Sequence, residues 1–183
     1  RPRGGGPPPP KAAAPPGHRL RGGRPDFSGD WACVAVAGDA DAFLASLQVD
    51  YFRRCAAAAL GYGVGLATRH IKQGVDAIIV KVGGTPKDYE QSFRVGAGQQ
   101  VSQGPDGKIL VNATWEAEYI LKAEQCELDG TQPNIWRQYY EGEDLVLHMC
   151  TLEGAGASWR FQRLTALSLS PDRPGLRVRA EKK

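Results

Sequence analysis

The side chains that could catalyse a reaction or hold a metal are scattered in this sequence. The four cysteines form no Cys-x-x-Cys pair and have no metal-like spacing to His70 or His148. No nucleophile stands beside a base, and no two carboxylates share a clear inward placement on a predicted element. We therefore expect no enzyme, no catalytic residue, no metal site and no cofactor, and binding chemistry becomes the question.

Aromatic and apolar side chains that alternate along predicted strands are the candidates for binding. Seven of them could line a cavity or fill a solid core: Tyr89, Phe93, Leu145, Leu147, Met149, Trp159 and Phe161. One cation, Arg137, stands among aromatic residues in the run Ile135-Trp136-Arg137-Gln138-Tyr139. Inside a cavity it would bind an anionic group, and on an outer face it would be a solvated charge. Both alternatives are open at this point.

Ten short runs with strand-like patterns must position these side chains. They are bounded by Gly, Pro and Asp turn residues and cover 31–37, 67–73, 77–82, 88–95, 99–102, 108–115, 119–126, 134–140, 144–151 and 158–164. Simple hairpin order favours closure, because closure removes exposed strand edges. We expect an all-β fold, a ten-stranded antiparallel up-and-down barrel that can enclose one ligand.

Two short helices are predicted between the first two strands. Asp39 and Asp41 stand where the first helix begins, and Asp50 can cap the second. The pair would cover the barrel mouth as a lid, with Phe43, Leu47, Tyr51, Phe52, Arg53 and Arg54 as its characteristic residues. The two arginines are either a solvated face or a means of guiding the lid to anionic membranes.

The composition changes at both ends of the chain. Residues 1–25 are predicted to be a disordered, basic arm rich in Pro and Gly, residues 26–166 the barrel, and residues 167–183 a basic tail. The arm keeps the chain solvated, presents a proline motif to a protein partner, or makes a basic contact with an anionic surface. The net charge of +3 comes mostly from these ends, so we expect no nucleic-acid partner.

The compartment is inferred from cysteine usage and hydropathy. No run reaches the length of about 18 apolar residues that a membrane span needs, so a soluble protein is expected. Four scattered cysteines could make two disulfides, but four buried free thiols are the preferred interpretation. We expect the cytoplasm, or alternatively an organelle interior after removal of a targeting peptide.

Four stretches together resemble the intracellular lipid-binding family, the fatty-acid-binding and retinoid-binding proteins of the calycin superfamily. They are FSGDW, DAFLASLQVDYFRR, IKQGVDAIIVKV and YEQSFRVG, and the resemblance extends from Phe27 to Arg163. It implies a ten-stranded barrel, a helix-turn-helix portal, and a cavity that carries fatty acids, retinoids or similar amphiphiles unchanged.

The resemblance also implies where a carboxylate would bind. Family members often place an inward Arg in the eighth strand and an inward Arg-x-Tyr pair in the last strand. Arg137 fits the first position, whereas the last strand reads Trp159-Arg160-Phe161, with Arg160 turned outward unless a bulge swaps the faces. The forked clamp is then incomplete, and a bulkier neutral or weakly acidic ligand becomes plausible.

Three functions follow from these observations. The first is non-covalent carriage of a small hydrophobic ligand, with Arg137 inside the cavity. The second is a structural or adaptor subunit that keeps the barrel without a ligand and uses the arms to hold a larger assembly. An enzyme acting on a lipid-like substrate ranks last, because no catalytic set is visible.

Overall fold

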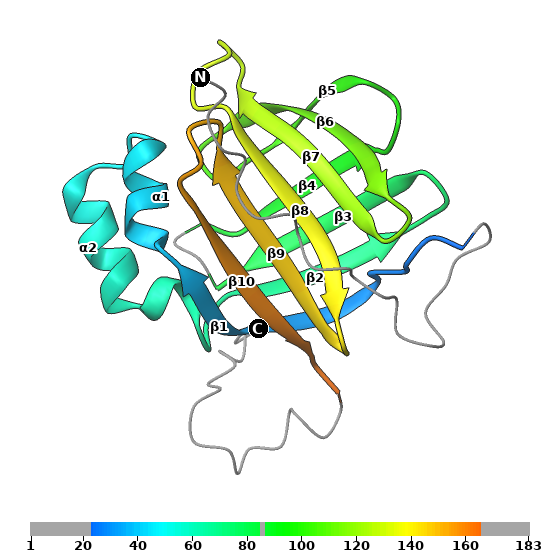
Figure 1. Cartoon of the computed structure of the whole chain (residues 1–183), viewed down its shortest axis with the longest axis horizontal. Coiled ribbons are helices and arrows are strands. Elements are labelled where there is room, and N and C mark those ends of the chain that lie inside the picture. Colours follow the sequence, from blue (N-terminus) through cyan, green and yellow to red (C-terminus); the bar gives the residue numbers. More distant parts are fainter. Residues whose placement is uncertain (1–22, 85–86, 166–183) are drawn as a thin grey trace, which may run out of the picture.

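The computed structural model describes residues 23–84 and 87–165, which form ten strands, two α-helices and a short 3-10 helix. Most of the expected N-terminal arm and the expected C-terminal tail lie outside the described residues. Figure 1 shows the strands wrapped around a common interior. They are β1 (Gly29–Gly38), β2 (Thr68–Gln73), β3 (Ala77–Gly83), β4 (Tyr89–Arg94), β5 (Gln99–Gln103), β6 (Lys108–Ala117), β7 (Ile120–Glu127), β8 (Asn134–Glu141), β9 (Asp144–Thr151) and β10 (Gly156–Arg163).

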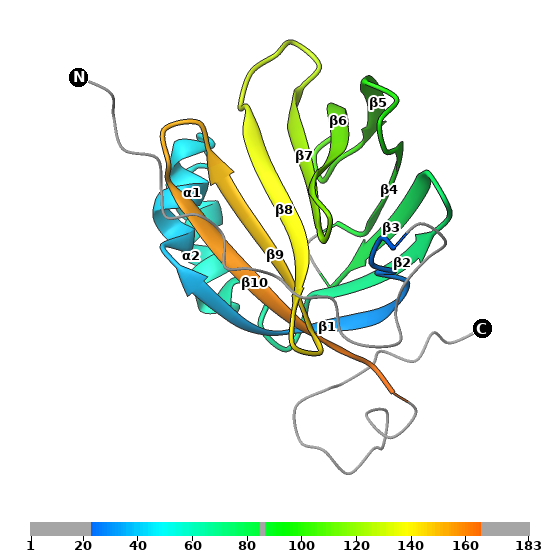
Figure 2. The same cartoon turned by 45° about the vertical axis from the view of Figure 1, so that its right-hand side comes forward.

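All ten strands belong to one antiparallel sheet. Its order is β4-β3-β2-β1-β10-β9-β8-β7-β6-β5, so every strand pairs with its sequence neighbours, except that β4 and β5 form the two edges and β1 pairs with β10. The sheet curls until these edges approach each other (Figure 2). The all-β, up-and-down barrel expected from the sequence is confirmed.

Side chains close the seam between β4 and β5. The Ser102 hydroxyl accepts a hydrogen bond from the Ser92 N–H at 3.0 Å and donates to the Ser92 carbonyl at 2.8 Å. The Gln100 amide does the same for Arg94, accepting at 2.8 Å and donating at 2.7 Å. Two polar side chains of β5 therefore satisfy backbone groups that a strand ladder would otherwise pair.

The period-two alternation of the strands separates an inner from an outer face. One apolar cluster runs through the interior and includes Ile71, Val80, Val111, Leu121 and Leu145, all fully buried. The opposite face carries exposed ion pairs such as Lys81 with Glu90. Burial of this inner face supplies the driving force for closure.

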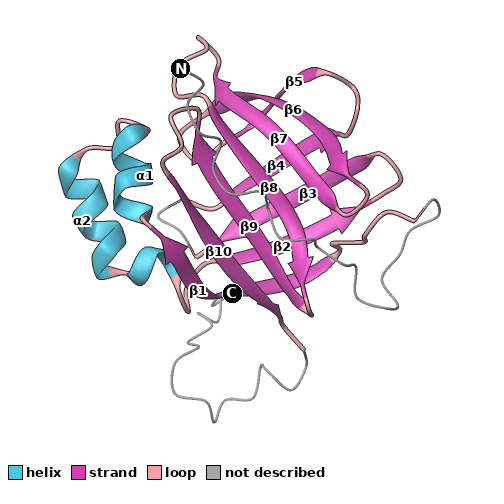
Figure 3. Ribbon diagram, in the orientation of Figure 1, coloured by secondary structure: helices cyan, strands magenta, loops and turns pink. Residues whose placement is uncertain are grey.

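The helices form where the aspartates predict. Asp39 caps α1 (Ala40–Ser46) by accepting from the Ala42 N–H at 2.8 Å, and Asp50 caps α2 (Tyr51–Ala59) by accepting from the Arg53 N–H at 3.0 Å. A 3-10 turn, η1 (Gly61–Gly63), leads on to β2. Both helices lie at one end of β1 and β10 (Figure 3). Helix α1 packs on β10 and β9, and α2 packs on α1 and η1.

The segment before β1 packs against the other end of the barrel. Phe27 is fully buried, the Tyr140 hydroxyl donates to the Asp26 carbonyl at 2.7 Å, and the Arg24 guanidinium lies 5.1 Å from the Trp115 ring centre. Arg24, which lies in the segment expected to be the arm, thus contacts the barrel, and the boundary at residue 26 stays a prediction.

All four cysteines are free, but the expectation that all are buried was wrong. Cys33 is buried, Cys126 and Cys150 are half-buried, and Cys55 is exposed on α2. None of the helices in the described ranges has both the length and the apolar character needed to cross a membrane. The same ranges contain no cluster of three or more metal-ligating side chains.

Candidate ligand-binding interior

The seven apolar candidates all lie on the inner face. Phe93, Leu145, Leu147 and Phe161 belong to the buried cluster. Three others pack against this cluster and are only partly buried: Tyr89, Met149 and Trp159. Their contact with a ligand stays a prediction.

Arg137 lies on the outer face, and its expected position inside the cavity was wrong. Its Nε and Nη2 donate to the two carboxylate oxygens of Glu116 at 2.6 and 2.8 Å, and its register partners are Lys122 on β7 and His148 on β9. The bidentate pair lowers the pKa of the Glu116 carboxyl and raises that of Arg137. The inward residues of β8 on either side of it are Trp136 and Gln138.

Gln138 brings an uncharged polar group into the interior. Its side chain is 1% exposed, and neither its amide oxygen nor its amide nitrogen has a hydrogen-bond partner. Its cross-strand neighbours are apolar, Leu121 on β7 and Leu147 on β9. A buried amide without hydrogen-bond partners costs folding free energy. A polar group of a ligand, or an internal water, would offset this cost.

Arg69 on β2 is the interior cation that the sequence interpretation missed. Its side chain is 9% exposed, its Nε has no partner, and its guanidinium carbon lies 5.8 Å from the Phe161 ring centre. Burial lowers the pKa of Arg69. The alternation of β2 was a usable signal: Arg69 shares a face with Ile71, whereas the other face carries His70 and Lys72.

A small hollow lies beside Arg69. Its volume is about 50 Å³, and its lining includes Arg69, Tyr89, Gln91, Trp136 and Met149. The Trp136 indole N–H donates to the Gln125 amide oxygen at 3.0 Å, which fixes this part of the wall. The hollow therefore combines aromatic surface, a flexible methionine and one cation.

The last strand has the expected register. Trp159 and Phe161 face inward and Arg160 faces outward, where it pairs with Glu141 and, at 3.1 Å, with Asp144. The irregularity of this sheet region lies in β1 between Cys33 and Ala35 and leaves the alternation of β10 intact. The inner faces of β8 and β10 therefore present no arginine at the positions discussed for the family.

Trp159 connects the barrel wall to the lid. Its indole N–H donates to the Tyr62 carbonyl of η1 at 3.0 Å, and its ring meets Phe43 of α1 edge-on at 6.0 Å. Tyr62 itself has a positive φ of 51°, which is uncommon for a non-glycine residue. The mouth of the barrel is thus held by a tryptophan that contacts both parts of the lid.

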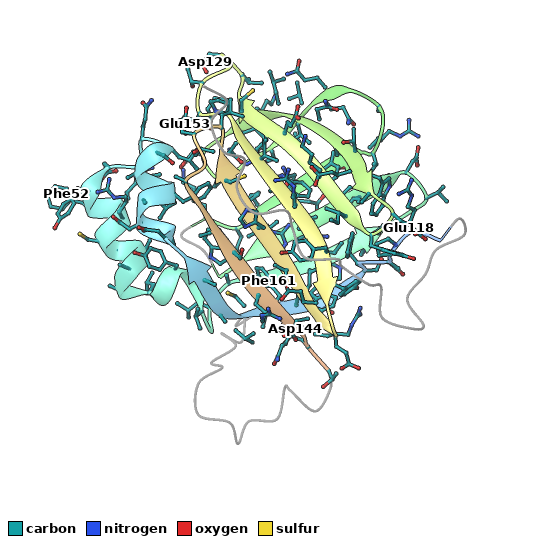
Figure 4. All side chains as sticks on the ribbon, in the orientation of Figure 1. Phe52, Glu118, Asp129, Asp144, Glu153 and Phe161 are labelled. Atoms are coloured by element: carbon teal, nitrogen blue, oxygen red, sulfur yellow. The ribbon has the colours of Figure 1, made fainter. Side chains whose placement is uncertain are left out.

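The six expected lid residues separate into packed and exposed groups. Phe43 is buried and Leu47 is half-buried, whereas Phe52 is 82% exposed and projects away from the barrel (Figure 4). Tyr51 is also exposed, and Arg53 and Arg54 pair with Asp50 and Asp41 respectively. Helix α2 has no buried residue, so its apolar side chains do not contribute to the core.

Among known proteins, similarity to this chain is found only with solved structures. No family model matches the chain, and no curated protein matches it. The chain is similar to human cRBP IV, a cellular retinol-binding protein, at 21% identity over 76% of this chain and 98% of the other, with a TM-score of 0.61. A second similar structure is the REP1-NXSQ fatty acid transporter, at 18% identity over 75% of this chain and 96% of the other, with a TM-score of 0.63.

The chain has the fold of the lipid-binding proteins. A mutant of the same transporter gives a similar result, with 19% identity, 75% and 97% coverage and a TM-score of 0.62. At these identities the likeness shows the fold alone. Both proteins are named for binding or transport rather than for catalysis.

Proposed function

We propose that this protein binds and carries a small hydrophobic ligand non-covalently inside its barrel, without altering it. The observation that supports this most strongly is the inner face, where apolar side chains surround a hollow lined by Arg69, whose Nε has no partner, and where the buried amide of Gln138 also lacks partners. A solid core seldom retains buried polar atoms of this kind, because each costs free energy. A ligand with an apolar body and a polar group would fit both features.

The lid provides the access route in this proposal. A groove between β1, α1 and η1 is lined by Val36, Asp39, Tyr62 and Val64 among others. Only Phe43 and Ala40 of the two helices are buried, so the lid is held by few apolar contacts. A segment attached in this way can open at low cost.

The adaptor function is the second candidate, and the size of the hollow favours it. The 50 Å³ beside Arg69 holds a few water molecules, whereas pockets for drug-sized ligands measure roughly 300–1,000 Å³. A carrier that used this hollow alone would gain space by moving Met149, Trp136 or the lid when the ligand enters. A protein that never binds a ligand would have no need for such movement.

Native mass spectrometry of the protein purified from its own source distinguishes the two candidates. A stoichiometric hydrophobic molecule, released on denaturation, is the result expected for a carrier. Met149→Trp places bulk in the hollow and should abolish retention, whereas His148→Trp on the outer face of the same strand should not. A bare chain, or one that leaves its source only with large protein partners, would replace the carrier by the adaptor.

The proposal also includes transient contact with a membrane, a protein partner and a reducing compartment. The exposed Tyr51 and Phe52 beside Arg53 suit transient contact with an anionic bilayer. A Phe52→Ser variant should then bind less to vesicles containing phosphatidylserine. The Pro-rich arm is the proposed site for a protein partner, and four free thiols support a reducing compartment such as the cytoplasm.

A further inference from the structure

Arg69 is a buried cation without a compensating anion. An arginine side chain keeps its proton at neutral pH even when burial lowers its pKa. Within residues 23–84 and 87–165, no carboxylate forms an ion pair with it, and the Phe161 ring 5.8 Å away offers only its π-face. Buried charges in folded proteins are normally paired, so this one calls for a partner that the chain itself does not supply.

Tyr89 is placed to share such a partner with Arg69. The register aligns Arg69 with Val82 and Val82 with Tyr89, so the two polar side chains stand in one row across β2, β3 and β4. Both line the same hollow. Burial raises the pKa of Tyr89, so its hydroxyl stays neutral and acts as a hydrogen-bond donor rather than as a counter-ion.

The opposite wall of the barrel offers no competing cation. The inward residues of β8 and β10 include Trp136, Gln138, Trp159 and Phe161, none of which is a cation, and Trp136 lines the hollow. Among the described residues that line the hollow, Arg69 alone carries a charge. The only strong electrostatic preference for a ligand group therefore arises from the wall formed by β2 to β4.

We propose that Arg69 and Tyr89 form an anion-binding subsite, and that the ligand is an amphiphile whose single acidic headgroup lies against the β2–β4 wall. This inference rests on the proposed carrier function and specifies the headgroup and its location. The cation of the proposed site is Arg69 on β2, whereas the sequence predicted Arg137 on β8.

The chemistry of a carboxylate suits the subsite. Its oxygens would accept hydrogen bonds from the Arg69 guanidinium and from the Tyr89 hydroxyl, and its charge would neutralise the cation. Its apolar tail would extend over Trp136, Leu147 and Met149, which line the same hollow. A neutral ligand of equal length would bury the same apolar surface but leave Arg69 uncompensated.

The test compares oleate with oleyl alcohol, which share a tail and differ in headgroup charge. Both are titrated into the full chain, with binding followed by tryptophan fluorescence. We expect the wild-type protein to bind oleate at least tenfold more tightly than the alcohol. Arg69→Met should remove this preference and leave binding of the alcohol intact, while Arg69→Lys should retain part of it.

Two further variants separate the subsite from general effects of charge. Tyr89→Phe should weaken oleate binding several-fold without affecting the alcohol. Arg137→Gln removes an arginine from the outer face and should change neither affinity. An unchanged preference for oleate in Arg69→Met, or equal affinities for both compounds in the wild type, would overturn the subsite while leaving the carrier function standing. A wild-type chain that binds neither compound would remove both proposals.

Thermal unfolding of the ligand-free protein provides a readout that does not depend on any ligand. An uncompensated buried cation destabilises the fold, so Arg69→Met should unfold at a higher temperature than the wild type. Arg137→Gln, which breaks an existing ion pair, should not. A lower unfolding temperature for Arg69→Met would show that Arg69 already has a stabilising partner and would overturn the proposal.

Discussion

Arg137 on the outer face and Arg69 on the inner face are residues of the same type in contrasting surroundings. Arg137 lies beside a carboxylate from β6, with two hydrogen bonds to Glu116. Arg69 lies beside aromatic rings and a tyrosine, without an anion among the described residues. Arg137 on the outer face is therefore paired, whereas Arg69 in the interior has no ion pair among the described residues.

The same contrast holds for uncharged polar groups. The buried side-chain atoms without a partner in the described ranges all belong to inward positions, on Arg69, Asn134, Gln138 and Thr151. On the outer face, His148 shares a hydrogen bond with Ser158 at 2.9 Å. A ligand with a polar group could satisfy these interior atoms. The following predictions test the difference between the two faces.

Truncating an inner apolar side chain should have the largest effect. Leu121 is fully buried, so Leu121→Ala should lower the free energy of unfolding by about 2–5 kcal/mol through lost contacts and a cavity. Val101 on β5 is exposed, and Val101→Ala should change the free energy of unfolding by less than about 0.5 kcal/mol. Urea unfolding measures both, and equal losses would contradict the division into faces.

Removing an inner amide should stabilise the ligand-free protein. Gln138→Leu replaces two polar atoms without partners and should raise the free energy of unfolding by about 1–3 kcal/mol. Gln125→Leu is the matched control, because it breaks the hydrogen bond from Trp136 and should lower that free energy. Destabilisation by Gln138→Leu would show that internal water or a retained ligand already satisfies the amide.

The outer ion pair should contribute less, and in a pH-dependent way. A double-mutant cycle of Glu116→Gln and Arg137→Gln should give a coupling of about 0.2–1 kcal/mol at neutral pH. Because the folded pKa of Glu116 lies below its ordinary value, the contribution is present above that value and is lost as pH falls through the lowered pKa. A coupling that does not vary between pH 7 and strongly acidic pH would rule out this assignment.

His148 should produce the smallest change. Burial and the nearby Arg137 lower its pKa from 6.5, so the unfolded chain binds a proton more readily than the folded one. Stability should therefore fall slightly as pH drops below the ordinary histidine value. His148→Asn should flatten this part of the pH profile, and an unchanged slope would assign it to other groups.

The strands were predictable because most of them alternate cleanly. In β4, Tyr89 and Phe93 share one face with Gln91, and Glu90 and Arg94 share the other, so the inner face could be read directly. The helix starts followed from their capping aspartates. The lid differed in one respect, since α2 packs on α1 and η1 and leaves Phe52 exposed.

The candidate site was less predictable because β8 alternates ambiguously. Ile135, Arg137 and Tyr139 form one face, and Trp136, Gln138 and Tyr140 form the other. Each face has two apolar or aromatic residues and one polar residue, so hydrophobicity alone cannot choose between them. In the structure Trp136 and Tyr140 join the buried cluster, and Arg137 lies on the outer face, where it pairs with Glu116 of β6.

The sequence alone determined the order of the elements, the helix starts and which residues of a strand share a face, since these depend on near neighbours along the chain. Only the tertiary structure decided which face of β8 is inside and that Arg69 and Tyr89 line one hollow without a carboxylate. These features depend on residues brought together from strands far apart in sequence. The electrostatics of a buried charge are set by such neighbours, and no local pattern encodes their absence.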